Sequence, residues 1–393
     1  MSGAVSLYPR EYFDMVIAAF ALLMGMSLSA AFLPLFAREL DPSGLLIGLV
    51  SSAWFMSRIF TEIPSGVMAD HFGRYKLMVG GLAFSSFGAF FCSMANVIYV
   101  LILGRALWGL GTALFFMSSS AFLFDLFKSS ERGQALGTYQ GIEFIGSLIG
   151  APLGGYVATI LGYRHVFFIS TVLIFCSFVI VLLSKKIRQR DVRNRDVSPL
   201  SSFKECLPSL RRWGLTTVYI SSFSRMLVMT GVTGTVFPLY LNLQLGMGVE
   251  LIGLIVSVRM VGVIIATVIS GYLSDKIGRK PMIVLGFLLQ SCCLYAYTLF
   301  YSFDALLALG LLEGFSRGMI ITSLLVLLSE VSPSKYRGGA IGMYRTFMDL
   351  GGFIGPILFM IIYDWAGSHF TFILAAAVLP LNAMIIASTR KTE

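Results

Sequence analysis

Charged side chains are scarce in this chain. Of its 393 residues, 12% are Asp, Glu, Lys or Arg, whereas 57% are hydrophobic. Soluble domains carry about twice that charged fraction, so the composition excludes an ordinary cytosolic protein and also a disordered or fibrous one. A chain that cannot cover a soluble surface with polar side chains is predicted to lie in a membrane.

Cysteine and histidine are also scarce, and neither forms a motif. The five cysteines include no CxxC pair and no Cys/His cluster, which excludes a disulfide framework and a metal site. The three histidines lie in predicted loops or at helix ends, so we expect no histidine proton switch inside the membrane. A nucleotide-binding loop and a Ser/His/Asp set are missing. We therefore expect neither an enzyme nor an ATP-driven pump, and no cofactor.

Long uncharged runs indicate the fold class. They include residues 77–104, 166–183, 281–303 and 370–389, and about 20 apolar residues are enough to cross a bilayer as a helix. A β-barrel is excluded because these runs do not alternate. We predict an all-α polytopic membrane protein with twelve transmembrane helices, over residues 13–36, 45–67, 77–95, 98–127, 134–160, 165–183, 215–241, 251–273, 282–302, 304–330, 339–363 and 369–388.

The distribution of basic residues predicts how the chain lies in the membrane. A polar segment, 184–214, separates an N-terminal six-helix bundle (1–183) from a C-terminal one (215–393) and is predicted to be a cytoplasmic linker. If both termini are cytoplasmic, 21 of the 29 Lys and Arg residues lie inside and two lie outside. This bias predicts a multi-pass protein of the cell (plasma or inner) membrane in that orientation. The net charge of +9 then faces anionic lipid, so we expect no nucleic-acid partner.

The two halves carry an internal repeat with an offset of 205 residues. The segment from Gly66 to Arg74, GVMADHFGR, recurs from Gly271 to Arg279 as GYLSDKIGR. The offset holds over some 85 residues without a gap. Six helices separate the copies, so both halves enter the membrane from the same side, as in a parallel repeat about an axis along the membrane normal.

The sequence resembles the major facilitator superfamily over essentially its whole length. The most specific element is Gly-x-x-x-Asp-x-x-Gly-Arg, present once in each half after its second helix. The resemblance is greatest to the 12-helix drug/proton antiporter branch. It implies two six-helix bundles around a central cavity that opens to alternate sides, and we expect a monomer.

The same resemblance implies a gating latch on the cytoplasmic side. Acids at the ends of predicted helices 4 and 10 are placed to pair with the arginines of the signature. The alternative is that these are ordinary interfacial charges, since exposed ion pairs are worth little. The residues of the predicted latch are Gly66, Asp70, Gly73, Arg74, Asp125, Gly271, Asp275, Gly278, Arg279 and Glu330.

Predicted helices 5 and 11 carry a second signature, rich in glycine, which resembles the antiporter motif of the family's drug/proton exporters. It departs from the motif where Ala151 precedes Pro152, and the second copy lacks the final glycine pair. We expect this face to pack one half on the other; generic small-residue packing is the alternative. The residues are Gly137, Gly146, Gly150, Pro152, Gly154, Gly342, Gly351, Gly355 and Pro356.

Ten ionisable residues lie inside predicted spans, where each costs about 2.5–3.5 kcal/mol on insertion scales. They must face a wet cavity or one another. Three pairs are spaced i, i+4, and the alternative for each is a pair that only neutralises itself. The ten are Arg58, Glu62, Arg105, Glu143, Arg225, Arg259, Glu313, Arg317, Arg345 and Asp349. We assign a substrate cavity to Arg58, Arg225, Arg259, Glu313, Arg317 and Arg345.

Four of these residues have no opposite charge as a neighbour on their own helix: Arg105, Arg225, Arg259 and Glu143. Arg105 lies in a segment, RALWGLG, that resembles a family motif linked to proton coupling, and the repeat has Gly310 at that position. Glu143 is predicted to carry the proton, because a carboxyl group in a low-dielectric site can bind and release one. We assign proton coupling to Glu143, Arg105, Glu62 and Asp349.

Function follows from the signatures and the charge count. Six in-span bases against four acids favour an anionic substrate, whereas the antiporter signature favours export of drug-like compounds. The main hypothesis is a proton-coupled exporter of a small amphipathic or anionic organic compound, with protons and the lipid bilayer as its other partners. The alternatives are an organic-anion importer driven by proton symport and a substrate sensor that does not transport.

Overall fold

The structure is a computed structural model that describes residues 8–128, 131–190, 213–332 and 337–388, without the side chains of 62–72 and 337–338. All regular elements in these ranges are helical. The apolar runs form long helices whose outer surfaces stay rich in exposed hydrophobic side chains, such as Phe60 (74% exposed), Val268 (72%) and Leu183 (70%). Such a surface is stable in lipid and not in water.

The N-terminal half begins with a broken helix. The predicted span 13–36 is α1 and α2, separated by a turn at 28–32, and Pro34 occupies the first turn of α2, where a missing N–H costs nothing. The elements of this half are α1 (Arg10–Ser27), α2 (Leu33–Leu40), α3 (Gly44–Phe72), α4 (Arg74–Ser93), α5 (Ile98–Leu126), α6 (Arg132–Leu161), α7 (Tyr163–Leu183) and the short α8 (Lys185–Gln189).

The C-terminal half contains a π-helical segment in its first span. That span is α10 (Trp213–Val228), η2 (Met229–Val236) and α11 (Phe237–Leu243). The wider π-helical turn is rare and occurs mostly at functional sites. The other elements are α12 (Val249–Ile277), α13 (Arg279–Ala296), α14 (Phe303–Val331) and α15 (Arg337–Ala387).

Twelve membrane crossings follow from these elements. Nine helices in the described ranges are long and apolar enough to span a membrane, with α15 counted once. Gly367 has a non-helical backbone (φ 79°) and divides α15 into two spans, and α1–α2 and α13 complete the twelve. The predicted fold class is confirmed.

The internal repeat is visible in the backbone. Gly73 and Gly278, the second glycine of each signature, have φ of 95° and 99°, and Gly162 and Gly367 have φ of 83° and 79°. Both pairs differ by 205 residues. Only glycine adopts this left-handed region without strain, so the repeat preserves glycine where two consecutive helices join.

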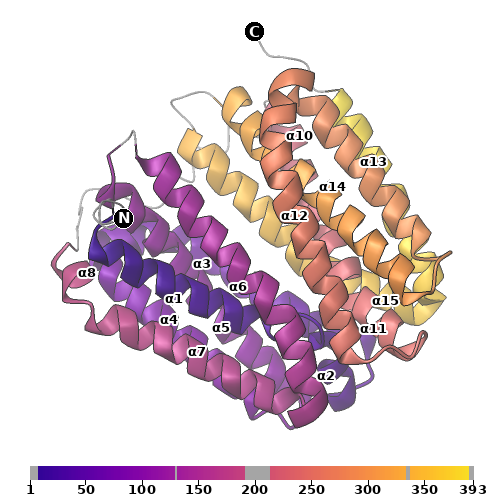
Figure 1. The fold of residues 1–393 in the computed structure, drawn as a ribbon, viewed down its shortest axis with the longest axis horizontal. Helices are drawn as coiled ribbons and strands as arrows, with labels where there is room; N and C mark the ends of the chain where they lie inside the picture. The colour runs from indigo at the N-terminus through magenta and orange to yellow at the C-terminus, as the bar shows by residue number, and fades with distance from the viewer. Residues whose placement is uncertain (1–7, 129–130, 191–212, 333–336, 389–393) are drawn as a thin grey trace, which may run out of the picture.

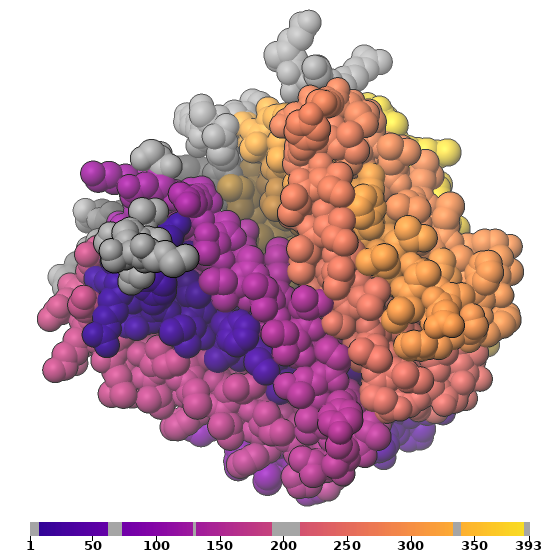
Figure 2. Space-filling view, in the orientation of Figure 1, coloured from indigo at the N-terminus to yellow at the C-terminus, as the bar shows by residue number. Residues whose placement is uncertain are grey.

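The two halves lie side by side as two bundles (Figure 1). Helices α6 and α12 come together at the end of the molecule that lies away from the chain termini and diverge toward the end that carries them. We call these the closed end and the open end. In the space-filling view the surface is hollowed between α6 and α12 toward the open end (Figure 2).

Candidate functional site

Two serines connect the halves at the closed end. On α3, Ser52 donates a hydrogen bond to the backbone carbonyl of Phe353 on α15, at 2.5 Å. On α12, Ser257 donates one to the carbonyl of Leu148 on α6, at 2.8 Å. Both donor and acceptor positions are related by the 205-residue offset, so the repeat produces the same contact twice.

Glycines allow these helices to approach closely. A Cβ at Gly48 of α3 would lie 2.7 Å from the carbonyl oxygen of Pro356, and one at Gly253 of α12 would lie 2.8 Å from that of Ala151. These positions also obey the offset of 205. Because the obstructing atoms are backbone, no side-chain movement makes room, and the halves meet only if both positions lack a side chain.

Contact between the halves is lost toward the open end. Among the described residues, no heavy atom outside the glycine's own helix backbone lies within 4 Å of a Cβ placed at Gly137, Gly141, Gly271 or Gly342. These glycines lie on α6, α12 and α15, the helices that meet at the closed end. The structure is therefore closed at one end and open at the other.

The glycine-rich signature packs inside each half, which differs from the sequence expectation. A Cβ at Gly146 would lie 2.9 Å from the carbonyl oxygen of Phe20 on α1, and one at Gly351 would strike that of Phe223 on α10. Gly150, Gly154 and Gly355 likewise face α1 or α10.

The reason is helical geometry: positions four apart share one face, and that face is turned toward the first helix of the same half, α1 or α10. The prolines of the signature lie on the opposite face. Pro152 contacts Gly253 and Pro356 contacts Gly48, each across the halves.

A buried ion pair joins the halves at mid-span. Arg58 of α3 lies 3.3 Å from the carboxylate of Asp349 on α15, and its guanidinium stacks on Trp54 at 4.6 Å from the ring centroid. Asp349 is fully buried and Arg58 is 8% exposed. The side chain of Glu62, the i+4 neighbour of Arg58, lies outside the described residues.

A second buried ion pair lies within the C-terminal half. Arg259 of α12 pairs with Glu313 of α14, and its guanidinium also contacts the carbonyl of Thr233 at 3.3 Å and the ring of Phe237. Glu313 is fully buried. Asp349 and Glu313 thus both pair with an arginine of another helix, in addition to the i, i+4 relation that the sequence shows.

Four of the six in-span arginines have no carboxylate partner among the described side chains: Arg105, Arg225, Arg317 and Arg345. Arg317 donates to the sulfur of Met229 at 2.9 Å, and Arg345 donates across the halves to the sulfur of Met117 at 3.1 Å. The Nε of Arg225 is buried without a hydrogen-bond partner. A thioether is a weak acceptor, so these guanidinium groups have capacity for a stronger one.

Glu143 and Arg105 are each buried in part, and they are not joined to one another by an ion pair. Glu143 lies beside Tyr139 on α6, and its Oε1 is buried with no hydrogen-bond partner among the described residues. The guanidinium of Arg105 lies 5.5 Å from the ring centroid of Trp108, and its Nε is also unpartnered. The assignment of proton coupling to these two residues therefore stays a prediction.

The arginines of the repeated signature pair with the expected acids. Arg74 contacts Asp125 within the N-terminal half. Arg279 contacts Asp275 and lies 3.1 Å from Glu330. These pairs lie within single halves at the open end. Gly66 belongs to α3, but the side chain of Asp70 lies outside the described residues, so the latch itself stays a prediction.

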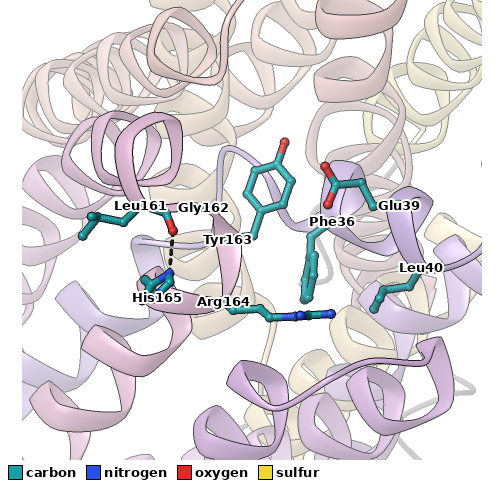
Figure 3. Close-up of a pocket in the computed structure, with 8 residues that line it drawn as sticks. All are labelled: Phe36, Glu39, Leu40, Leu161, Gly162, Tyr163, Arg164 and His165. Carbon is teal, nitrogen blue, oxygen red and sulfur yellow. Dashed lines mark hydrogen bonds between the residues drawn. The ribbon is translucent and has the colours of Figure 1, made fainter.

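A pocket of about 360 Å³ lies at the closed end, between α2 and the start of α7. Figure 3 shows Glu39 and Tyr163 at one side and His165 bonded to the carbonyl of Leu161 at the other. Arg164 is held by the carbonyl of Ala95 at 3.2 Å. None of the ten in-span charges lines this pocket, so we do not assign it to the transported substrate.

Sequence reasoning missed the contacts that depend on tertiary structure. Besides the two serines, Thr235 of η2 bonds to Ser51 of α3 at 3.2 Å, across the halves. Because Ser52 recurs as Ser257 at the 205-residue offset, the repeat could have identified these two serines from the sequence. Nothing in the sequence marks Met117 or Met229, because their role depends on which arginine lies opposite.

The comparisons with known proteins agree with this architecture. The model of the Major Facilitator Superfamily matches residues 15–232 and 218–393. Multidrug resistance protein 2 of Bacillus subtilis is 25% identical over 92% of this chain and 90% of its own, and the multidrug resistance protein MdtG of Dickeya zeae is 28% identical over 93% and 89%.

Solved structures show the same fold. An inward-facing, unoccupied bacterial homologue of the human lysosomal transporter Spinster superposes with a TM-score of 0.81 at 14% identity, covering 95% of both chains. A D-xylose–proton symporter superposes with a TM-score of 0.78 at 16% identity, covering 98% of both. The family match spans both halves. This chain therefore belongs to the Major Facilitator Superfamily and is a membrane transporter rather than an enzyme.

Proposed function

We propose that the protein is a proton-coupled secondary transporter that exports a small amphipathic or anionic organic compound by alternating access. The observation that carries the proposal is the asymmetry of the contact between halves. The halves meet through Ser52 and Ser257 at one end and lie apart at Gly137 and Gly271 toward the other. Two rigid bundles that touch at one end and lie apart at the other form one of the two end states of an alternating-access cycle.

The positive-inside bias supports a cytoplasmic open end, and in that orientation this is the state that loads substrate for export. The start of α1 and the basic helix α8 (Lys185–Gln189) lie toward that end (Figure 1). The relatives named as multidrug resistance proteins support export of an organic compound.

The charge of the C-terminal half supports an anionic group on the substrate. Arg225, Arg259 and Arg317 surround a single described acid, Glu313, and three of these four side chains are at most 4% exposed. Burial of an unpaired charge is costly. A carboxylate or similar anion on the substrate compensates this charge and replaces the sulfur of Met229 as the partner of Arg317.

Glu143 is our candidate for the proton-binding residue. Its unpartnered oxygen is buried in α6, the helix whose outer part contacts α12. A carboxyl group in that position is stabilised by a proton when no base is near, and rotation of the halves changes its access to water. Arg105, on the neighbouring α5, then acts through the field that it creates rather than through a bond.

Transport by purified protein in liposomes tests the proposal. We would add acidic, neutral or cationic fluorescent compounds outside the liposomes and impose a pH gradient of either sign. Uptake into vesicles with an acidic interior indicates exchange of the compound for protons. Uptake driven by protons that enter together with the compound instead identifies an importer, and binding without flux identifies a sensor; either result would overturn the proposal.

A further inference from the structure

A pocket of about 470 Å³ lies where α1, α7 and α8 meet, far from the buried charges of the C-terminal half. Its lining residues are Arg10, Asp14, Ile180, Leu183, Ser184, Lys185 and Lys186. Figure 1 shows α8 beside the start of α1, at the outer side of the N-terminal half. We call this the α8 pocket.

Three contacts fix α8 against the bundle. Ile187 is fully buried, the hydroxyl of Ser184 donates to Asp14 at 2.6 Å, and Arg190 pairs with Glu11 at 3.0 Å. A helix of five residues has no stability of its own in water, so these contacts are what hold it. As a result, Lys185 and Lys186 are carried on a fixed backbone at the rim of the pocket.

The pocket carries an excess of positive charge. Arg10, Lys185 and Lys186 have no ion-pair partner in the part of the chain that the structure describes, and Asp14 is the single acid of the lining. Glu11, the other acid nearby, is paired with Arg190. Three bases against one acid suit a ligand with a compact negative charge, such as a phosphate group.

The floor of the pocket is apolar and continues into the lipid-facing surface. Ile180 and Leu183 belong to the last turn of α7, whose span ends at residue 183, and Leu183 is 70% exposed. The pocket therefore has cationic groups at the level where headgroups lie and apolar side chains one turn deeper. A free phosphate ion would contact only the cationic groups, whereas a phospholipid would contact the apolar side chains as well.

We propose that the α8 pocket binds one anionic phospholipid, with the phosphate of its headgroup held by Arg10, Lys185 and Lys186 and an acyl chain along Ile180 and Leu183. This differs from general attraction of basic loops to an acidic membrane, because α8 is held in place and the site is discrete. The proposal does not depend on the direction or coupling of transport.

Native mass spectrometry of the full chain in detergent tests this, with phosphatidylglycerol, phosphatidylcholine and glycerol 3-phosphate as probes. The variant is Lys185→Gln/Lys186→Gln. The matched control is Lys76→Gln/Lys128→Gln, which removes two exposed lysines from the same end of the same half. We expect one tightly bound phosphatidylglycerol, weakened about tenfold or more in the variant and unchanged in the control. Phosphatidylcholine and glycerol 3-phosphate should bind much more weakly.

Asp14→Asn supplies a test of opposite sign. The amide oxygen still accepts the bond from Ser184, while the negative charge is removed, so phosphatidylglycerol should bind more tightly. Equal loss in the variant and the control would show diffuse attraction and overturn the proposal. Binding of glycerol 3-phosphate as strong as that of the lipid would show a soluble-phosphate site and overturn it as well.

Discussion

Ser52 and Ser257 make the same hydrogen bond from opposite halves of the molecule. Each donates from its hydroxyl to a main-chain carbonyl of the other half, at 2.5 and 2.8 Å, and the two bonds are related by the internal repeat. A hydrogen bond of this kind contributes about 1 kcal/mol. Two such bonds contribute to closure at this end without making it too stable to open, together with the bonds of Gly44 to Asp364 and Thr159 to Glu250.

Replacement of these serines should shift the equilibrium between the two states. Ser52→Ala and Ser257→Ala should each lower the population of the present state by about fivefold relative to its alternative. The double variant should show the product of the two fold-changes, because the two bonds join different pairs of helices. Electron–electron distance measurements between labels at positions 161 and 254 would report the separation of the closed end.

Ser57→Ala is the matched control for the serine variants. Ser57 lies on α3 as Ser52 does, but its hydroxyl donates to the carbonyl of Trp54 in the same helix. An equal shift in Ser57→Ala would show that the effect comes from α3 itself and not from the contact between halves.

Leucine at Gly253 and leucine at Gly146 should have different consequences. Gly253→Leu places a side chain against the backbone of α6 in the other half, so it should force the closed end apart. Gly146→Leu acts against α1 in its own half, so it should lower thermal stability and leave accessibility nearly unchanged. Labelling of Ala151→Cys, in a chain without its native cysteines, by an impermeant maleimide would separate the two; similar labelling in both variants would contradict the assignment.

Loss of one member of the Arg58–Asp349 pair should be more harmful than loss of both. Asp349→Asn leaves a buried cation, which costs about 3–5 kcal/mol. Arg58→Met/Asp349→Leu removes both charges and keeps apolar contact with Trp54, so its stability should approach that of the wild type. Thermal denaturation in detergent measures both. If the double variant is as unstable as the single one, the pair is not what stabilises this contact.

Glu143→Gln should abolish transport driven by a pH gradient while substrate binding persists without pH dependence. Glutamine keeps the size and the hydrogen bonds of the residue but cannot bind a proton. Glu131→Gln, in an exposed position just before α6, is the control. Arg105→Lys should impair coupling less than Arg105→Ala, because it keeps the charge that acts at a distance. Accumulation against a gradient by Glu143→Gln at the wild-type rate would assign coupling to another acid.

Asp70→Asn and Asp275→Asn should both impair transport without affecting membrane insertion. The repeated signature places an acid at both positions, and Arg279 keeps its contact with Glu330 when Asp275 is changed. Flux and surface expression are measured together, with Asp304→Asn, an exposed acid at the start of α14, as control. Normal flux in both variants would remove the gating role.

The spans and the repeat could be predicted because they depend on local composition and on similarity at a fixed offset. The side-chain partners could not. Arg345 and Asp349 share a helix face, and so do Glu313 and Arg317, but the acids reach Arg58 and Arg259 on other helices. Helical spacing identifies neighbours on one helix, whereas the partner on another helix depends on how the bundle packs. The π-helical form of η2 has no local signature for the same reason.

The two serines donate to main-chain carbonyl groups. The bonds therefore do not constrain which side chain stands at either acceptor position during evolution. Residue 148 is leucine and the equivalent residue 353 is phenylalanine, yet both provide the same oxygen at the same place. A duplicated gene can accumulate substitutions at such positions without loss of the contact, as long as each serine and the neighbouring glycine remain. The two halves could therefore diverge in their interior charges while their closure stayed symmetrical.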